Sequence, residues 1–300
     1  MTRVLSALVL LPVVIGTIWF LPPIGTLVLA VVAAVLAFAE YRTIGAALGV
    51  SVHGGVGGIA VALTCVAMAI GGSPSGVMFD EGSLTAPNTV YLVLAAAMLV
   101  LGAVSVGSAS PGPAVLANVA ASLFPAIYIG LPLGALAAVR GEIGGMASHV
   151  RIVEIGDVLP HLPAGYPDGR VVVLLLLAII VISDSAQYYT GRAFGRRPLA
   201  PTISPKKTVE GAVGGVVFGT LAMIVGGHFI FASPLWVLAL TGAVISMLGI
   251  VGDLFESLLK RSAGVKDSSN LIPGHGGVLD RIDSWLFAAP VYYMFVRFIA

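Results

Sequence analysis

Charge and cysteine are both scarce in this 300-residue sequence. Charged residues make up 10% of it, whereas hydrophobic residues make up 58%. The mean hydropathy of +1.05 excludes an ordinary soluble domain. The one cysteine, Cys65, lies in the middle of an apolar stretch. A single thiol excludes a disulfide framework and a cysteine-based metal site, so we expect Cys65 to be an inert, packed side chain.

Familiar nucleotide-binding and targeting motifs are also missing. No Walker-type Gly-Lys-Ser/Thr run occurs, and Gly191 and Gly195 lack the strand context and the third glycine of a Rossmann motif. The N-terminal apolar run is similar to a signal peptide, but no small-residue cleavage site follows it. We therefore expect this run to be retained as a first transmembrane helix.

The apolar residues fall into stretches long enough to cross a hydrocarbon core, which takes about 20 apolar residues per helix. We expect nine spans, near residues 4–21, 24–39, 55–71, 89–107, 114–138, 171–187, 211–231, 234–251 and 284–299. The predicted fold class is an all-α integral membrane protein, a polytopic bundle of about nine transmembrane helices with a polar active site on its cytoplasmic side.

The basic residues indicate the orientation of such a bundle. With a cytoplasmic N-terminus, eleven Lys and Arg residues lie on the cytoplasmic side and four on the other, a clear positive-inside bias. The cytoplasmic set is Arg3, Arg42, Arg192, Arg196, Arg197, Lys206, Lys207, Lys260, Arg261, Lys266 and Arg281. We expect a protein of the cell (inner) membrane with its N-terminus and active site cytoplasmic.

The chain divides into three regions. Residues 1–140 are apolar helices rich in small residues, which we expect to form a packed scaffold and which could offer a dimer face. We expect residues 141–170 to form a polar extracytoplasmic loop, because their residue spacing matches no familiar metal-ligand pattern. Residues 171–300 gather polar side chains at cytoplasmic helix ends, and we expect them to be the catalytic transmembrane region.

A polar face follows the eighth apolar stretch. If that helix continues, Asp253, Glu256, Ser257 and Lys260 share one face, because they stand at i, i+3, i+4 and i+7. A carboxylate, a hydroxyl and an ammonium together suit a bound metal-phosphate. The alternative is an interfacial helix end whose charges reach out to water. That alternative accounts for Lys260 and Arg261 but not for the short-stemmed carboxylates.

A glycine-rich turn precedes the last apolar stretch. His275-Gly276-Gly277 is followed by Asp280 and Asp283, one helical turn apart. Glycines permit positive φ and close approach of a ligand, and successive backbone N–H groups can form an anion-binding nest. Carboxylate oxygens are the ligands that Mg²⁺ prefers. Separately, these features would indicate a loop and a helix N-cap. Together they predict a metal-phosphate site.

A second polar cluster precedes the seventh apolar stretch. In Ser204-Pro205-Lys206-Lys207-Thr208, Ser204 or Thr208 is expected to cap the helix that begins near Glu210. Two lysines ahead of a helix N-terminus favour bound phosphate, although positive-inside topology alone also explains them. Asp184 is harder to explain, because it interrupts an otherwise apolar helix.

These motifs together resemble the CDP-diacylglycerol synthase (phosphatidate cytidylyltransferase) family. The signature is Ser257-x-Leu259-Lys260-Arg261-x4-Lys266-Asp267-x-Ser269-x2-Ile272-Pro273-x-His275-Gly276-Gly277-Val278-x-Asp280-Arg281-Ile282-Asp283. Similar segments precede it: Gly191-Arg192-x-Phe194-Gly195, Ser204-Pro205-Lys206-Lys207-Thr208-x-Glu210-Gly211 and Gly252-Asp253-Leu254-x-Glu256-Ser257. The likeness covers about residues 183–284. Departures are Ser185-Ala186-Gln187 after Asp184 and a long 140–170 segment.

The resemblance implies a reaction of phospholipid biosynthesis, in which CTP and phosphatidic acid give CDP-diacylglycerol and pyrophosphate. It implies Mg²⁺ and a second, monovalent cation such as K⁺, with Asp253 and Asp280 as metal ligands. The expected catalytic residues are Asp253, Asp280, Lys260, Arg261, Lys266, His275, Arg281 and Asp283. The expected substrate-binding residues are Lys206, Lys207, Ser204, Arg192, Glu256, Ser257, Asp267, Gly276, Gly277 and Asp184. The expected partners are CTP, phosphatidic acid, the bilayer and a second copy of the chain, and no nucleic acid.

The chemistry fits such a set. The phosphate monoester of phosphatidic acid is already largely ionised near neutral pH, so the reaction needs no strong base. The difficulty is to bring two polyanions together, which metal ions and Lys or Arg clamps address. We therefore expect His275 to contact phosphate or to orient a ligand.

Two other classes remain open. In a transporter or channel, Asp184 and Asp253 would be ion sites, but the polar groups crowd at one face and line no path across the membrane. The other class is a related enzyme that uses CTP on a different lipid, such as a polyprenol kinase or an archaeal ether-lipid cytidylyltransferase. The complete run from His275 to Asp283 favours the diacylglycerol enzyme.

Overall fold

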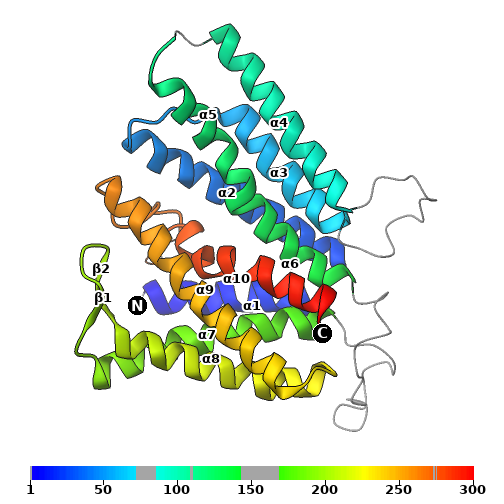
Figure 1. Ribbon diagram of the computed structural model, residues 1–300, viewed down its shortest axis with the longest axis vertical. Coiled ribbons are helices and arrows are strands. Elements are labelled where there is room, and N and C mark those ends of the chain that lie inside the picture. Colours follow the sequence, from blue (N-terminus) through cyan, green and yellow to red (C-terminus); the bar gives the residue numbers. More distant parts are fainter. Residues whose placement is uncertain (1, 72–85, 109–110, 143–168, 273, 275) are drawn as a thin grey trace, which may run out of the picture.

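The computed structural model describes residues 2–71, 86–108, 111–142, 169–272, 274 and 276–300, which form a bundle of helices and one short hairpin (Figure 1). The helices are α1 (Thr2–Phe20), α2 (Pro23–Ala47), α3 (Gly54–Gly71), α4 (Ala86–Ser108), α5 (Ala114–Pro125), the π-helix η1 (Ala126–Gly130), α6 (Leu131–Glu142), α7 (Gly169–Phe194), α8 (Val209–Ile230), α9 (Leu235–Ser262) and α10 (Leu279–Phe298). The antiparallel strands β1 (Pro198–Ala200) and β2 (Ser204–Thr208) form the hairpin.

Seven helical stretches of the described chain are long and apolar enough to cross a membrane. They are α2, α3, residues 89–107 of α4, the continuous stretch 114–141, α7, α8 and α9. This confirms the predicted all-α polytopic membrane protein. The first and last expected spans correspond to α1 and α10, which are not among the seven.

Three helices run well past the predicted ends of their spans. The expected spans 24–39, 171–187 and 234–251 become α2, α7 and α9, which end at Ala47, Phe194 and Ser262. Hydropathy detects only the apolar part of a helix, whereas backbone hydrogen bonding continues through polar residues that still face a protein neighbour. The additional turns carry Glu40 and the polar face of α9 into the interior.

The N-terminal and C-terminal helices pack against each other through a shared hydrophobic cluster. One buried cluster combines side chains of α2, α3 and α6, among them Phe38 and Leu133, with Leu279 and Leu286 of α10. A second cluster unites α7 to α10 around Leu176, Ile245 and other aliphatic residues. The start of α10 is therefore packed against α2, although more than 200 residues separate them in the sequence.

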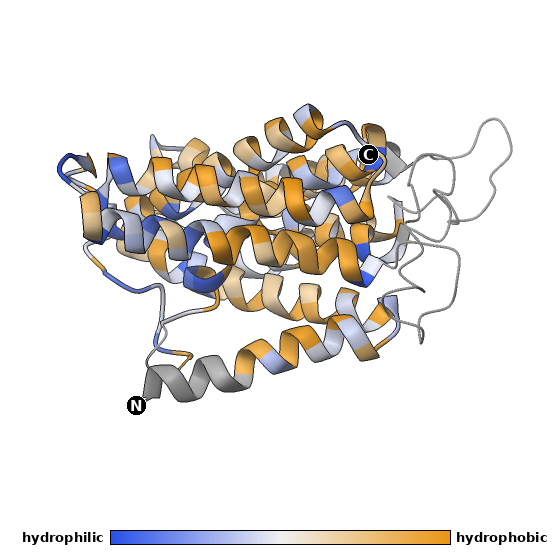
Figure 2. Ribbon diagram, turned by 90° about the horizontal axis from the view of Figure 1, so that it is seen from below, coloured by the Kyte–Doolittle hydropathy of each residue, from blue (hydrophilic) through white to orange (hydrophobic). Residues whose placement is uncertain are grey.

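Most hydrophilic residues of the described chain gather at one end of the bundle, while its middle is mainly hydrophobic (Figure 2). This end, called the polar end below, carries the connection 48–53, the β1–β2 hairpin and the described residues of the segment 263–278 (Figure 1). The hairpin was not predicted from the sequence. Lys206 and Lys207 lie on its second strand, directly before α8.

Candidate active site

The predicted polar face of α9 is confirmed. The helix continues to Ser262, Ser257 Oγ donates to Asp253 Oδ1 over 3.4 Å, and Lys260 forms an ion pair with Glu256 one turn earlier. Lys260 is buried and Glu256 has no solvent exposure. The alternative in which the charge of Lys260 reaches water is therefore wrong, because its ammonium points into the protein.

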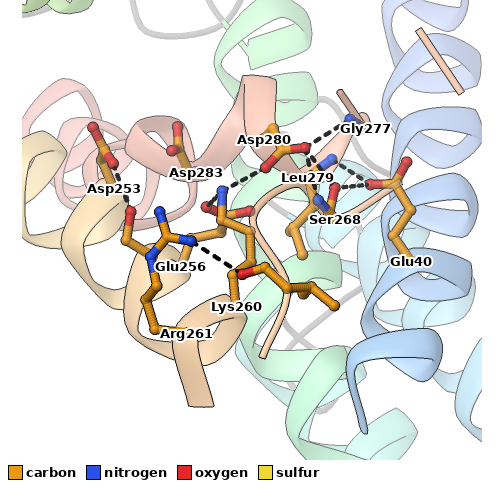
Figure 3. Close-up of polar contacts among 12 residues, drawn as sticks. Glu40, Asp253, Glu256, Lys260, Arg261, Ser268, Gly277, Leu279, Asp280 and Asp283 are labelled. Carbon is orange, nitrogen blue, oxygen red and sulfur yellow. Dashed lines mark hydrogen bonds and ion pairs between the residues drawn. The ribbon is translucent and has the colours of Figure 1, made fainter. Parts of the chain in front are cut away.

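Asp280 lies at the centre of a buried hydrogen-bond network at the start of α10 (Figure 3). Its Oδ1 accepts from Lys260 Nζ at 2.5 Å. Its Oδ2 accepts from the Gly277 N–H at 2.7 Å, the Ser268 N–H at 3.0 Å and the Ser268 hydroxyl at 2.9 Å. Burial acts to raise the pKa of Asp280, but these donors outweigh it and lower the pKa to about 2. The carboxylate is thus ionised and fixed in place.

Glu40 of α2 joins the same network from the other side, and no sequence prediction had named it. Both carboxylate oxygens accept hydrogen bonds from the segment 268–279: from the hydroxyls of Ser268 and Ser269 and from the N–H groups of Val278 and Leu279. The side chain is buried. The only sequence signal was a lone carboxylate next to an apolar run, which is costly unless it has partners.

The glycine-rich turn has the predicted backbone but holds a different anion. Gly274 and Gly276 have φ of 77° and 79°, as expected for a turn that L-residues avoid. The N–H groups of Gly277, Val278 and Leu279 donate to Asp280 and Glu40. The predicted nest therefore binds carboxylates of the chain itself in this structure. His275 and Pro273 lie outside the described residues.

Asp253 and Asp283 lie beside each other where α9 and α10 cross (Figure 3). A Cβ added to Gly252 would stand 2.5 Å from the Asp283 carbonyl oxygen, so only glycine permits this approach. Burial raises the pKa of Asp283, and the carboxylates of Asp253 and Asp184 raise it further. Three carboxylates therefore gather near one another at the polar end.

Lys207 connects the hairpin to these carboxylates, because its ammonium forms an ion pair with Asp253. The Asp253 side chain is 30% exposed, against 5% for Asp280, so Asp253 is the more accessible metal candidate. Within the described chain, no three His, Cys, Asp or Glu side chains are grouped so that they could hold a metal. Carboxylate oxygens nevertheless suit Mg²⁺, which usually completes its shell with water and substrate phosphates. The predicted assignment of Asp253 and Asp280 to metal stays a prediction.

Hydrogen bonds connect the hairpin to α8 and to α9. The Thr208 hydroxyl accepts from the Gly211 N–H at 3.1 Å, which confirms Thr208 as the N-cap of α8 in preference to Ser204. Arg261 of α9 donates to the Ile203 carbonyl in the turn of the hairpin at 3.4 Å and to the Val265 carbonyl at 3.2 Å. These contacts hold the hairpin and the 263–278 segment beside the α9 end.

Most of the other predicted site residues are exposed. Exposed side chains belong to Asp184, Arg192, Lys206, Arg261, Lys266, Asp267 and Arg281. Next to Asp184, an apolar cavity of about 350 Å³ lies between α7 and α8, lined by Val181, Ala186 and Phe218 among others. Asp184 therefore lies close to an apolar groove between α7 and α8.

Comparison with known proteins gives a consistent result. The sequence model of a protein family described as "Cytidylyltransferase family" matches residues 1–299 of this chain. "Uncharacterized protein YnbB" of Escherichia coli (strain K12) is 39% identical over 173 residues, which is 57% of this chain and 58% of that protein. "Phosphatidate cytidylyltransferase" of Synechocystis sp. is 40% identical over 196 residues, 62% of this chain and 64% of that protein. A protein of the same name from Haemophilus influenzae is 42% identical over 136 residues, 44% of this chain and 47% of that protein. The chain thus spans less than two thirds of each of these relatives.

Proposed function

This chain belongs to the cytidylyltransferase family, and we propose that it is a membrane-embedded phosphatidate cytidylyltransferase. It would join CTP and phosphatidic acid to give CDP-diacylglycerol and pyrophosphate. The observation that carries this proposal is the ion pair between Lys207 and Asp253, with Asp283 beside it. It brings the hairpin, α9 and α10 together into one charged site at the polar end of an apolar bundle.

The reaction is an in-line displacement at phosphorus. An oxygen of the phosphatidic acid monoester forms a bond to the α-phosphorus of CTP, and the bond from that phosphorus to the bridging oxygen of the β-phosphate breaks. Pyrophosphate leaves with the electron pair. Because the attacking oxygen is already ionised, the site has to neutralise and align phosphates instead of removing a proton.

The chain offers groups for each of these tasks. Lys206, Arg261, Lys266 and Arg281 are exposed cations around the site and are suited to bind phosphate oxygens. Asp253 would hold Mg²⁺, which supplies positive charge against the phosphates when it is bound. Asp280 would join it as a ligand only by exchanging one of its donors for the ion, because both of its oxygens already accept hydrogen bonds. A monovalent cation such as K⁺ would add to that charge. Asp283 and Asp184 would assist beside Asp253.

The surroundings suit a lipid substrate. The phosphate head would lie at the polar end, while the acyl tails stay in the bilayer against apolar helix surface. The groove between α7 and α8 opens beside Asp184 and is almost entirely apolar. A tail in this groove would leave its headgroup near the carboxylates, because both features lie on the same end of α7. We further propose that the N-terminus and the site are cytoplasmic, where CTP is available, and that the chain acts as a homodimer.

A direct assay tests the function. Detergent-purified protein is incubated with phosphatidic acid, Mg²⁺ and each of the four ribonucleoside triphosphates, and pyrophosphate release is measured. We expect release with CTP alone, dependent on lipid. In Asp253→Asn release should be lost, whereas Thr43→Val, an exposed change on α2, should match the wild type.

The same assay can contradict the proposal. Release that needs no lipid, or no release from folded wild-type protein with any nucleotide, excludes this lipid as the acceptor. Turnover with a polyprenol or an ether-lipid phosphate in its place would assign the chain to a related membrane enzyme.

A further inference from the structure

We propose that Glu40 is a positioning residue, which holds the segment 268–279 and through it sets the place of the Asp280 carboxylate. Its catalytic consequence rests on the proposed function. Its structural basis does not, because every contact involved lies within the chain.

Glu40 is saturated with hydrogen-bond donors from one distant segment. Oε1 accepts from Ser269 Oγ at 2.7 Å and from the Val278 N–H at 2.9 Å. Oε2 accepts from Ser268 Oγ at 2.9 Å and from the Leu279 N–H at 2.8 Å. The four donors come from both ends of the 268–279 segment, so a single side chain closes this segment into a loop.

Ser268 connects Glu40 to Asp280. Its hydroxyl oxygen lies 2.9 Å from Glu40 Oε2 and 2.9 Å from Asp280 Oδ2, and its N–H donates to the same Asp280 oxygen at 3.0 Å. A hydroxyl has one proton, so it can donate to only one of these carboxylates at a time. The position of Ser268, and therefore the donor set of Asp280, depends on Glu40.

The part of α2 that carries Glu40 is firmly packed. Its neighbours Ala37, Phe38, Tyr41 and Ile44 are all buried in the cluster that α2 shares with α6 and α10. The carboxylate also lies at the N-terminus of α10, where a negative charge is favoured by the helix dipole and by the free N–H groups. A packed helix thus presents its anion to a segment that joins the end of α9 to the start of α10.

A carboxylate is required here because three donors converge on it, together with the Ser268 hydroxyl when its proton is not directed to Asp280. In a glutamine of the same size only one oxygen accepts, and the amide nitrogen would point two hydrogens at groups that are themselves donors. The conflict leaves buried donors without partners, which is costly. Glu40→Gln therefore changes hydrogen bonding without changing side-chain volume, and this makes it the sharpest test.

The experiment uses the full-length protein in detergent, as wild type, Glu40→Gln, Glu40→Asp and Thr43→Val. Thr43 lies one turn further on α2, is exposed, and donates only to the Ala39 carbonyl in the described structure. Hydrogen–deuterium exchange of residues 268–279 is measured without substrate, together with the melting temperature. Steady-state assays then give kcat and the KM values for CTP and for phosphatidic acid.

In Glu40→Gln we expect exchange in 268–279 to be about tenfold faster or more, as for the loss of one or two hydrogen bonds to a charged acceptor. The value of kcat should fall by a similar or larger factor, with KM for CTP changed less than about threefold, because alignment and not binding is lost. Glu40→Asp keeps the charge and should recover part of kcat. Thr43→Val should match the wild type.

Two results overturn the proposal. Exchange in 268–279 that is unchanged in Glu40→Gln shows that Glu40 does not hold the segment. Faster exchange with an unchanged kcat shows a purely structural role. If Glu40→Gln does not fold, Ser269→Ala removes one of the four donors, and an unchanged kcat there is equally decisive. Wild-type protein without cytidylyltransferase activity refutes the proposed function, while the exchange measurement still decides whether Glu40 holds the segment.

Discussion

Lys260 of α9 donates a 2.5 Å hydrogen bond to Asp280 of α10, and the same buried ammonium is ion-paired with Glu256. One cation therefore serves two buried carboxylates. Removal of the ammonium is costly, because it leaves the Asp280 carboxylate and the Glu256 carboxyl group buried without their shared partner. Lys260 therefore stabilises the fold, whatever contact it also makes with substrate.

Lys260→Met tests that task. We expect the variant to lose about 3–5 kcal/mol of stability, the usual cost of removing one partner of a buried ion pair. Lys266→Met is the matched control: Lys266 is exposed, so its loss should change stability by less than about 0.5 kcal/mol. Denaturant unfolding of the two detergent-purified variants gives the comparison. Equal stabilities would show that the Lys260 ion pairs contribute nothing.

Gly277→Ala tests how closely Glu40 approaches the turn. A Cβ at this position would overlap the Glu40 carboxylate and the Ser268 hydroxyl. Because both groups are fixed by hydrogen bonds, we expect a loss of about 1–3 kcal/mol, typical of overpacking.

Gly55→Ala is the control for this change, because a Cβ there meets nothing within 4 Å and alanine favours helix. It should be neutral or slightly stabilising in thermal unfolding. If Gly277→Ala is as stable as Gly55→Ala, the close approach of α2 to the turn is not real.

Local patterns in the sequence predicted part of this site well. The shared face of Asp253, Glu256, Ser257 and Lys260 follows from helical periodicity, and the Thr208 cap follows from the residue types next to a helix start. Both features depend on residues three or four positions apart. The positive φ of Gly276 was also predictable, because it follows from the residue type itself.

The rest depends on contacts that no local pattern encodes. Glu40 meets Ser268 across 228 residues, so nothing in the sequence near Glu40 indicates its partners. The hairpin was missed because Ser204–Thr208 contains a proline and two lysines and lacks the apolar alternation of a strand. The turn that was expected to bind phosphate binds Glu40 and Asp280 instead. Its N–H groups donate to these two carboxylates, which come from other positions in the sequence.

Lys207 and Lys206 offer a matched test within one strand. Lys207 is ion-paired with Asp253, whereas Lys206 is exposed on the neighbouring position. We expect Lys207→Met to reduce pyrophosphate release about 100-fold, since it removes a positioned charge near the reacting phosphates. Lys206→Met should cost about tenfold or less, as for a more weakly held phosphate contact. Equal losses in the two variants would remove the special role of the Lys207–Asp253 pair.

Metal dependence is the last prediction, and the exposure of Asp253 makes it specific. A chelator should abolish CTP-dependent pyrophosphate release, and added Mg²⁺ should restore it, because two polyanions meet at the site. In Asp253→Glu the carboxylate is retained but displaced by one methylene, so we expect the Mg²⁺ concentration for half-maximal rate to rise about tenfold or more. Asp267→Glu, an exposed change in the neighbouring segment, should leave that concentration unchanged. Full activity in the presence of the chelator would contradict a metal role for Asp253. The Lys207–Asp253 pair would then act on the phosphates without a metal ion.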